Sequence, residues 1–281
     1  MHSSARRNSS KAPKRNNMII DSHTHIYPDK IAERAVVGIG SFYNVAVPNK
    51  GTIDDLLFIS ERAGVDKCLV CSVATKAEQV KSINDFIASA VTAHPDKFYG
   101  FGSIFPGAED MAEQVDALIE RGLHGIKLHP DCQKLNCDNE DAMALYSAVN
   151  GRVPILFHAG DYRTDYSSPE RLLRVSKEHP ELDMILAHFG GWGIWGSHAE
   201  ELAKCPNVWV DMSSSQQFTD SNTVFRLIKL YGSERVFFGS DYPMWDAKDE
   251  LALLRKLDLS DDELENIYHR SFEKFISKYV K

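Results

Sequence analysis

Long apolar runs are missing from this sequence of 281 residues, in which no stretch approaches the eighteen or so residues that a membrane span requires. This absence excludes a conventional transmembrane helix, and we expect no membrane partner. Hydrophobic residues still make up 43% of the chain, which is enough for a sizeable core. A chain of this length fits one large α/β domain.

A positive charge excess is also missing, because the formal net charge is −8. The one strongly basic segment is 1–17, which contains Lys and Arg but no acid. We therefore expect no nucleic-acid partner. The segment has no hydrophobic stretch, which excludes a secretory signal. We predict that 1–17 is a disordered extension or one left by cloning, with a transit peptide as the alternative, and that Met18 is the natural start.

Cysteine is scarce and odd in number, with five residues, and no second CxxC accompanies Cys68 and Cys71. A zinc-binding set of two such pairs is therefore excluded. The pair lies in an apolar, strand-like run, where residues three apart face opposite sides. We expect buried, reduced thiols and a cytoplasmic location, while Cys132 and Cys137 have no assigned role.

Past residue 17, short apolar runs alternate with amphipathic stretches, which is typical of repeated βα units. The predicted strands are 18–26, 67–74, 98–105, 125–129, 153–158, 183–188, 208–212 and 236–241. Helical patterns lie near 52–63, 76–93, 109–121, 139–149, 168–178, 198–204 and 220–231, and two or three more follow the last predicted strand. Eight strands with intervening helices predict an α/β fold, a single (β/α)8 TIM-like barrel over 18–281. A doubly wound open sheet is the alternative.

Polar residues stand at the carboxyl ends of five predicted strands, where barrel enzymes place their chemistry. These strand ends supply His23, His25, Lys127, His129, His158, His188 and Asp241. Elsewhere the strands are apolar, as a buried parallel sheet requires. Each histidine alone could be an ordinary core or loop residue, but so many at strand ends favour a binding site.

His23 and His25 are two residues apart on one strand, so they point to the same side and can bind one ion together. A His-x-His pair alone is a weak signal. His158 and Asp241 would complete the site from two other strands. Three imidazoles and a carboxylate suit a divalent metal, zinc first, with manganese or iron as alternatives.

The motifs IIDSHTHIYP, GIKLHP, FHAG, LAHFGGW and FFGSDYP span residues 19–243 in that order. In these motifs the chain resembles the amidohydrolase superfamily, in the branch of aminocarboxymuconate semialdehyde decarboxylase and related lactonases. The resemblance implies that His23, His25 and His158 are metal ligands. It also implies that Asp241 binds the metal and accepts a proton from its water. His188 would bind a second ion or, with one ion, orient water or substrate.

Lys127 has three possible roles. In members with two metals, a lysine on the fourth strand is carboxylated and bridges the ions. Members of the branch resembled here commonly use one ion, which we favour. Lys127 would then be a cationic clamp for an anionic substrate or a plain charged rim residue.

Further substrate contacts are predicted from loops at the same end of the strands. His129 shares a face with Lys127 and could reach the mouth. Trp192 stands in a glycine-rich loop and could wall a pocket or simply pack. Tyr162 and Arg163 follow His158 and could contact substrate, although their loop could instead cap the next helix.

Hydrolysis of an amide, lactone or ester bond in a small carboxylate-bearing substrate is the leading function. Metal-dependent, non-oxidative decarboxylation is the alternative, because both reactions use the same ligands. No arginine lies in a strand-end motif, so the anion-binding partner of a decarboxylase is not assigned. A non-catalytic metal-binding scaffold is a third hypothesis. A homodimer is left open, and the stretch FYNVAVP could be a lid or an interface segment.

Overall fold

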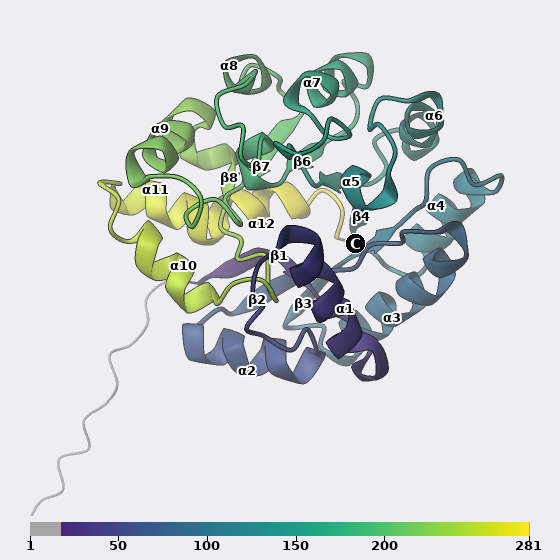
Figure 1. Cartoon of the computed structure of the whole chain (residues 1–281), viewed down its shortest axis with the longest axis horizontal. Helices are drawn as coiled ribbons and strands as arrows, with labels where there is room; N and C mark the ends of the chain where they lie inside the picture. Colours follow the sequence, from purple (N-terminus) through teal and green to yellow (C-terminus); the bar gives the residue numbers. More distant parts are fainter. Residues whose placement is uncertain (1–17, 281) are drawn as a thin grey trace, which may run out of the picture.

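In the computed structural model, which describes residues 18–280, eight parallel strands form a barrel surrounded by helices (Figure 1). The strands are β1 (Ile20–His25), β2 (Lys67–Cys71), β3 (Phe98–Ser103), β4 (Gly125–Leu128), β5 (Ile155–Phe157), β6 (Met184–Leu186), β7 (Val208–Asp211) and β8 (Val236–Phe237). They neighbour one another in sequence order, which confirms the predicted barrel. Residues 1–17, for which the sequence predicts an extension, lie outside the described residues.

The barrel is closed between β8 and β1 by backbone hydrogen bonds rather than by a long ladder. The Ser22 N–H donates to the Phe238 carbonyl at 2.9 Å, and the Asp241 N–H donates to the His23 carbonyl at 2.9 Å. A parallel bridge joins Thr24 and Tyr242. The residues that follow β8 are therefore fixed against the end of β1, which brings Asp241 next to the histidine pair.

Each strand is followed by at least one helix, and most of the helices pack outside the barrel. They are α1 (Asp29–Tyr43), α2 (Ile53–Ala63), α3 (Val80–Ala93), α4 (Met111–Glu120), α5 (Pro130–Gln133), α6 (Glu140–Val149), α7 (Pro169–Glu178), α8 (Ala199–Leu202), α9 (Ser221–Tyr231), α10 (Ala247–Leu254), α11 (Asp261–Glu265) and α12 (Ser271–Ile276). Short 3-10 or π turns lie at η1 (Ala77–Gln79), η2 (His188–Gly190), η3 (Ser233–Arg235) and η4 (Asn266–Arg270). None of the helices in the described part of the chain is long and apolar enough to cross a membrane.

Two helices, α1 and α5, are absent from the sequence prediction. Helix α1 contains Gly38 and Gly40 beside the β-branched Val36 and Val37, and these residue types favour helix weakly. It begins four residues after β1 and lies across the barrel mouth (Figure 1). The predicted lid or interface segment FYNVAVP begins inside this helix, at Phe42.

The apolar core has two parts, one between strands and helices and one inside the barrel. The inner part is closed at the amino-terminal end of the strands by Phe272 and Phe275 of α12, which pack on Phe237. Side chains two residues apart on a strand point to the same side of the sheet. Farther along the same strands, the side chains that point into the barrel are polar. Leu156 and His158 are one such pair. The barrel is thus filled with apolar side chains at one end and lined by polar ones at the other.

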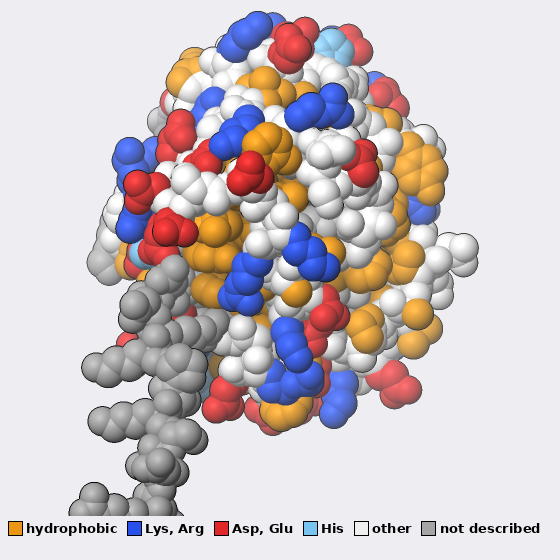
Figure 2. Space-filling view, turned by 90° about the vertical axis from the view of Figure 1, so that its left-hand side faces the viewer, with side chains coloured by type: hydrophobic (Ala, Val, Ile, Leu, Met, Phe, Trp, Pro, Cys, Tyr) orange, Lys and Arg blue, Asp and Glu red, His pale blue; other side chains and the backbone are white. Residues whose placement is uncertain are grey.

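Charged side chains on the outer surface are mixed in sign. Figure 2 shows Lys and Arg interspersed with Asp and Glu over the face that it presents, with apolar side chains exposed between them.

Candidate metal centre and substrate cavity

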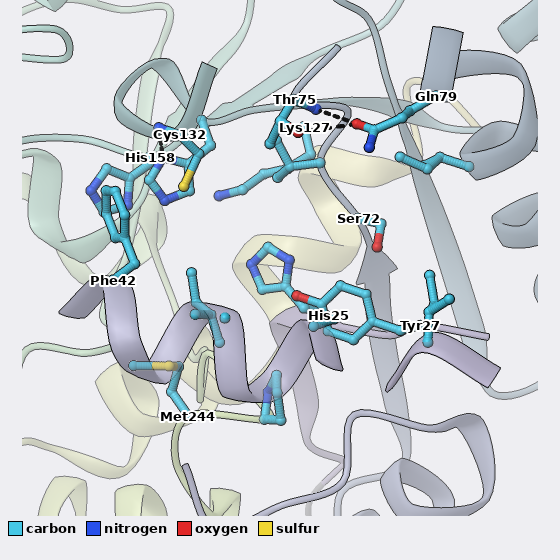
Figure 3. Close-up of a pocket in the computed structure, with 18 of the residues that line it drawn as sticks. His25, Tyr27, Phe42, Ser72, Thr75, Gln79, Lys127, Cys132, His158 and Met244 are labelled. Carbon is cyan, nitrogen blue, oxygen red and sulfur yellow. Dashed lines mark hydrogen bonds between the residues drawn. The ribbon is translucent and has the colours of Figure 1, made fainter. Parts of the chain in front are cut away.

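The polar strand ends line one cavity of about 770 Å³. The predicted site residues that border it are His23, His25, Lys127, His129, His158, His188 and Asp241. Figure 3 shows Lys127 and His25 pointing into this space, with Phe42 and Met244 on the side of α1. The chain therefore brings together all seven strand-end residues that the sequence singles out.

His23, His25 and Asp241 direct three donor atoms toward one point. The Nε2 atoms of the two histidines are 3.1 Å apart. Oδ1 of Asp241 lies 3.5 Å from Nε2 of His23 and 3.6 Å from Nε2 of His25. The side chains of His25 and Asp241 are 12% and 14% exposed, so a group in the cavity can reach them.

The chemistry and spacing of these donors fit a divalent metal ion. Zinc binds histidine nitrogen and carboxylate oxygen at about 2.0–2.2 Å, which places neighbouring ligand atoms of a tetrahedron roughly 3.3–3.6 Å apart. The three separations of 3.1, 3.5 and 3.6 Å are close to that spacing. Imidazole and carboxylate ligands also suit manganese and iron, so the donor set does not identify the metal.

His158 and His188 form a second pair of nitrogens beside the first. Nε2 of His188 lies 3.1 Å from Nδ1 of His158. The His188 ring stacks on that of His23, with centroids 5.6 Å apart, which connects the two pairs. Nδ1 of His188 lies 2.8 Å from the Ser213 carbonyl oxygen, so this nitrogen carries the proton of the neutral ring. The lone pair on Nε2 of His188 then faces His158. The role of His158 as a metal ligand stays a prediction.

Asp211, at the end of β7, is a site residue that lies outside all the strand-end motifs. Its buried Oδ2 lies 2.9 Å from Nδ1 of His23, and its Oδ1 accepts a hydrogen bond from the Ser213 hydroxyl at 2.5 Å. Burial acts to raise the pKa of Asp211, but the charge and hydrogen bond of His23 outweigh it and lower the pKa to about 2. The ionised carboxylate accepts the Nδ1 proton of His23 and leaves Nε2 free to bind a metal.

Lys127 projects from β4 into the centre of the cluster. Its side chain is fully buried, and Nζ lies 3.1 Å from Nε2 of His23. Burial lowers the pKa of Lys127, although nearby acids oppose the shift. The interpretation as a plain charged rim residue is wrong, because the side chain has no exposed surface. The roles of substrate clamp and carboxylated bridge stay open predictions.

Asp241 adopts an unusual backbone conformation that aims its carboxylate at the histidines. Its φ is +62°, in the left-handed region that few residues other than glycine enter. Oδ2 accepts a hydrogen bond from the Ser214 hydroxyl at 2.6 Å, which leaves Oδ1 facing His23 and His25. Burial acts to raise the pKa of Asp241, but the surrounding histidines and Ser214 hold it well below its usual range. Asp241 is therefore an ionised acceptor.

His129 occupies the cavity wall next to His158. The two rings are stacked, with centroids 4.0 Å apart and an interplanar angle of 7°. Nδ1 of His129 accepts the backbone N–H of Cys132 at 3.3 Å, so His129 is the N-cap of α5. His129, His158 and Asp131 form another group of close donor atoms. The Asp131 carboxylate already accepts the hydroxyls of Ser167 and Thr164, so we place no ion there.

Arg163 is not among the residues that border the main cavity, so the structure does not support its predicted contact with substrate. Its guanidinium pairs with Asp161 at 2.6 and 2.9 Å and donates to the Phe42 carbonyl at 2.6 Å. It also lies over the ring of Tyr43, 4.8 Å from the centroid. Arg163 therefore holds the carboxyl end of α1 in place through Phe42 and Tyr43.

Trp192 lies beside the main cavity, and its contact with substrate stays a prediction. It is buried and borders a small space next to the main cavity, together with Tyr43, His158 and Phe218. Its ring meets that of Tyr43 edge-on at 5.2 Å. Tyr162 packs on the outer side of Trp192 at 5.5 Å and is 66% exposed, so it lies away from the donor cluster.

Comparison with known families decides the relationship that the strand-end motifs suggest. The family model of the amidohydrolases matches residues 20–271. The chain belongs to the amidohydrolase family. This match confirms the resemblance and extends it past the last strand-end motif. No curated protein matches the sequence of this amidohydrolase.

Solved structures share the fold at low sequence identity. An uncharacterised TIM-barrel protein from Bordetella bronchiseptica is 18% identical, with a TM-score of 0.79 and coverage of 94% of this chain and 100% of that one. 5-Carboxyvanillate decarboxylase from Sphingomonas paucimobilis is 15% identical, with a TM-score of 0.72 and coverage of 92% and 99%. The same enzyme from Novosphingobium aromaticivorans, solved with bound manganese and a nitrobenzoic acid, is 16% identical, with a TM-score of 0.72 and coverage of 98% and 100%.

Proposed function

We propose that this amidohydrolase is a metal-dependent, non-oxidative decarboxylase of a small aromatic or unsaturated acid. The observation that carries the proposal is the cavity, in which the polar donor cluster faces an apolar wall. That wall includes Ile31, Ala35, Ile39 and Phe42 of α1. A flat apolar ring bearing a carboxylate is complementary to such a space. The 5-carboxyvanillate decarboxylases of the same fold support this choice over hydrolysis, the leading prediction from the sequence.

We propose that one divalent ion is held by His23, His25, His158 and Asp241. Manganese is now as strong a candidate as zinc, because the Novosphingobium enzyme contains it. The bound ion would supply Lewis-acid polarisation of the substrate oxygens. Lys127 donates to the substrate carboxylate from the buried side of the cavity.

The decarboxylation requires a proton at carbon. A proton adds to the ring carbon that bears the carboxylate, the bond between them breaks, and carbon dioxide leaves. The electron pair of that bond restores the ring, so one proton is consumed for each carbon dioxide released. Asp241 and His188 are the groups beside the cavity that can hold and transfer this proton.

Hydrolysis is a second candidate, and the state of Asp241 favours it. An ionised carboxylate at the donor cluster is a ready acceptor for a proton from water. Cleavage of a lactone, ester or amide would use this base without any proton transfer to carbon.

The two candidates are separated by following the products. Purified protein is reconstituted with Mn²⁺ or Zn²⁺, its metal content is measured, and it is incubated with 5-carboxyvanillate, 2,6-dihydroxybenzoate and a panel of lactones, esters and amides. We expect about one metal per chain and release of carbon dioxide from an aromatic acid. In D₂O the product should carry one deuterium at the vacated carbon.

The His158→Ala variant, which should lose metal and turnover together, is the control. Cleavage of lactones, esters or amides without carbon dioxide release would replace decarboxylation by hydrolysis. A chain that binds no metal under any reconstitution would contradict both.

A further inference from the structure

Tyr43, the last residue of α1, brings a hydroxyl group to the side of the donor cluster. This hydroxyl lies 2.9 Å from Nε2 of His129 and 3.4 Å from Nε2 of His158. Its ring borders both the main cavity and the small space beside it. In Figure 3 the end of α1 at Phe42 reaches the side of the cavity where His158 and Cys132 lie. No strand-end motif includes Tyr43, so no role for it is predicted from the sequence.

The hydrogen bond between Tyr43 and His129 has a defined direction. Nδ1 of His129 accepts the backbone N–H of Cys132 at 3.3 Å, so the proton of the neutral ring is on Nε2. That N–H can only donate, and the Tyr43 oxygen is its acceptor at 2.9 Å.

The contact with His158 depends on which of its nitrogens faces the donor cluster. Nδ1 of His158 faces Nε2 of His188, whose ring stacks on that of His23, so Nδ1 is on the side of the donor cluster and would be the nitrogen that binds a metal. When Nδ1 is a ligand, the ring proton is on Nε2 and points at the Tyr43 oxygen. Tyr43 then accepts from two N–H groups, and its own hydrogen is free to point into the cavity.

We propose that the Tyr43 hydroxyl contacts the substrate and donates a hydrogen bond to an anionic oxygen of a small aromatic acid, an inference that rests on the function proposed above. The ring is held in place for this task. The Arg163 guanidinium covers one face, and Trp192 meets it edge-on. Tyr43 is thus a specificity residue for acids whose carboxylate or phenolate oxygen reaches the end of α1.

The test measures binding of a coloured probe, 4-hydroxy-3-methoxy-5-nitrobenzoic acid, to the metal-loaded protein by its change in visible absorbance. Tyr43→Phe removes only the hydroxyl, and we expect the Kd to rise about tenfold or more, as for loss of a hydrogen bond to a charged group. Tyr162→Phe is the matched control, because Tyr162 is 66% exposed and does not border the cavity. Its Kd should stay within about twofold of the wild type. Metal content is measured for every variant.

An unchanged Kd in Tyr43→Phe, with the wild type binding the probe, would overturn the inference but not the proposed function. Loss of metal in Tyr43→Phe would also overturn it, because Tyr43 would then support His158 rather than the substrate. If the metal-loaded wild type does not bind the probe, the inference and the proposed aromatic acid fail together.

Discussion

At the residue scale, the chemistry of the centre depends on which nitrogen of each imidazole carries its proton. Asp211 sets this for His23, and the Ser213 carbonyl sets it for His188. Both partners are buried, so water does not compete for these protons. The consequence is that the nitrogens facing the cavity are lone-pair donors before any ligand arrives, which lowers the reorganisation needed to bind a metal.

Replacing Asp211 by Asn should therefore weaken the metal centre. The amide keeps the size of the side chain but loses the negative charge that attracts the Nδ1 proton of His23. We expect the Kd for Mn²⁺ or Zn²⁺ to rise about 10- to 100-fold, measured by competition with a coloured chelator. Asp258→Asn, at an exposed position, is the control. An unchanged Kd in a variant that keeps its near-UV circular dichroism would show that His23 does not need this carboxylate.

The strand-end histidines and Asp241 are predictable from sequence because polar side chains stand out at the ends of apolar strands. Asp211 carries the same signal, since it ends the strand VWVD, but no metal-binding motif includes it. Tyr43 carries no such signal, because a helix end brings it to the cavity from outside the barrel. Arg163 is the reverse case. Its position after His158 predicts a substrate contact, whereas its guanidinium binds Asp161 and the Phe42 carbonyl and does not border the main cavity.

At the element scale, α1 forms one wall of the cavity. Its carboxyl end is fixed by Arg163, which donates to the Phe42 carbonyl and covers Tyr43. Asn44 ends the helix in the left-handed conformation, and its N–H donates to the Gly40 carbonyl. The weak helix formers Gly38 and Gly40 make this end dependent on tertiary contacts.

Removing the Arg163 side chain should loosen α1 without affecting the barrel. In Arg163→Ala we expect amide hydrogen exchange in Asp29–Tyr43 to be about tenfold faster, because a charge-assisted hydrogen bond and a cation–π contact are lost. Exchange in the barrel strands should be unchanged, and mass spectrometry of peptides measures both. Arg226→Ala, on the exposed side of α9, is the matched control. Equal protection of α1 in the variant would show that other contacts hold the helix.

At the scale of the whole molecule, the barrel is predictable because its eight strands alternate with amphipathic helices, and all eight lie within their predicted ranges. The predicted ranges run past the observed ends, as at 67–74 for Lys67–Cys71. The extra residues at the carboxyl ends of the strands leave the sheet and lie at the end of the barrel that holds the donor cluster. The hydrophobic pattern cannot mark that boundary, because most residues just past the strand ends are as buried as those in the strands.

One acidic side chain in the core, that of Glu250, has an oxygen without a hydrogen-bond partner. Glu250 of α10 is fully buried, and Oε2 accepts a hydrogen bond from the Gln216 side chain at 2.9 Å, whereas Oε1 has no hydrogen-bond partner. Burial raises the pKa of Glu250 to about 8, although the bond from Gln216 opposes the shift. The carboxyl group is therefore protonated in the folded protein at neutral pH and ionised in the unfolded chain.

Folding consequently takes up a proton at Glu250 between pH 4.5 and about 8, so the stability of the wild type falls as pH rises through this window. Glu250→Gln keeps the acceptor for Gln216 and removes the titration. We expect the unfolding free energy of the variant, relative to the wild type, to rise by roughly 2–4 kcal/mol between pH 5 and pH 8. Urea unfolding at both pH values measures this difference. For the control Glu200→Gln, at an exposed position on α8, the unfolding free energy relative to the wild type should not depend on pH. If Glu250→Gln also shows no dependence on pH, Glu250 is ionised in the core.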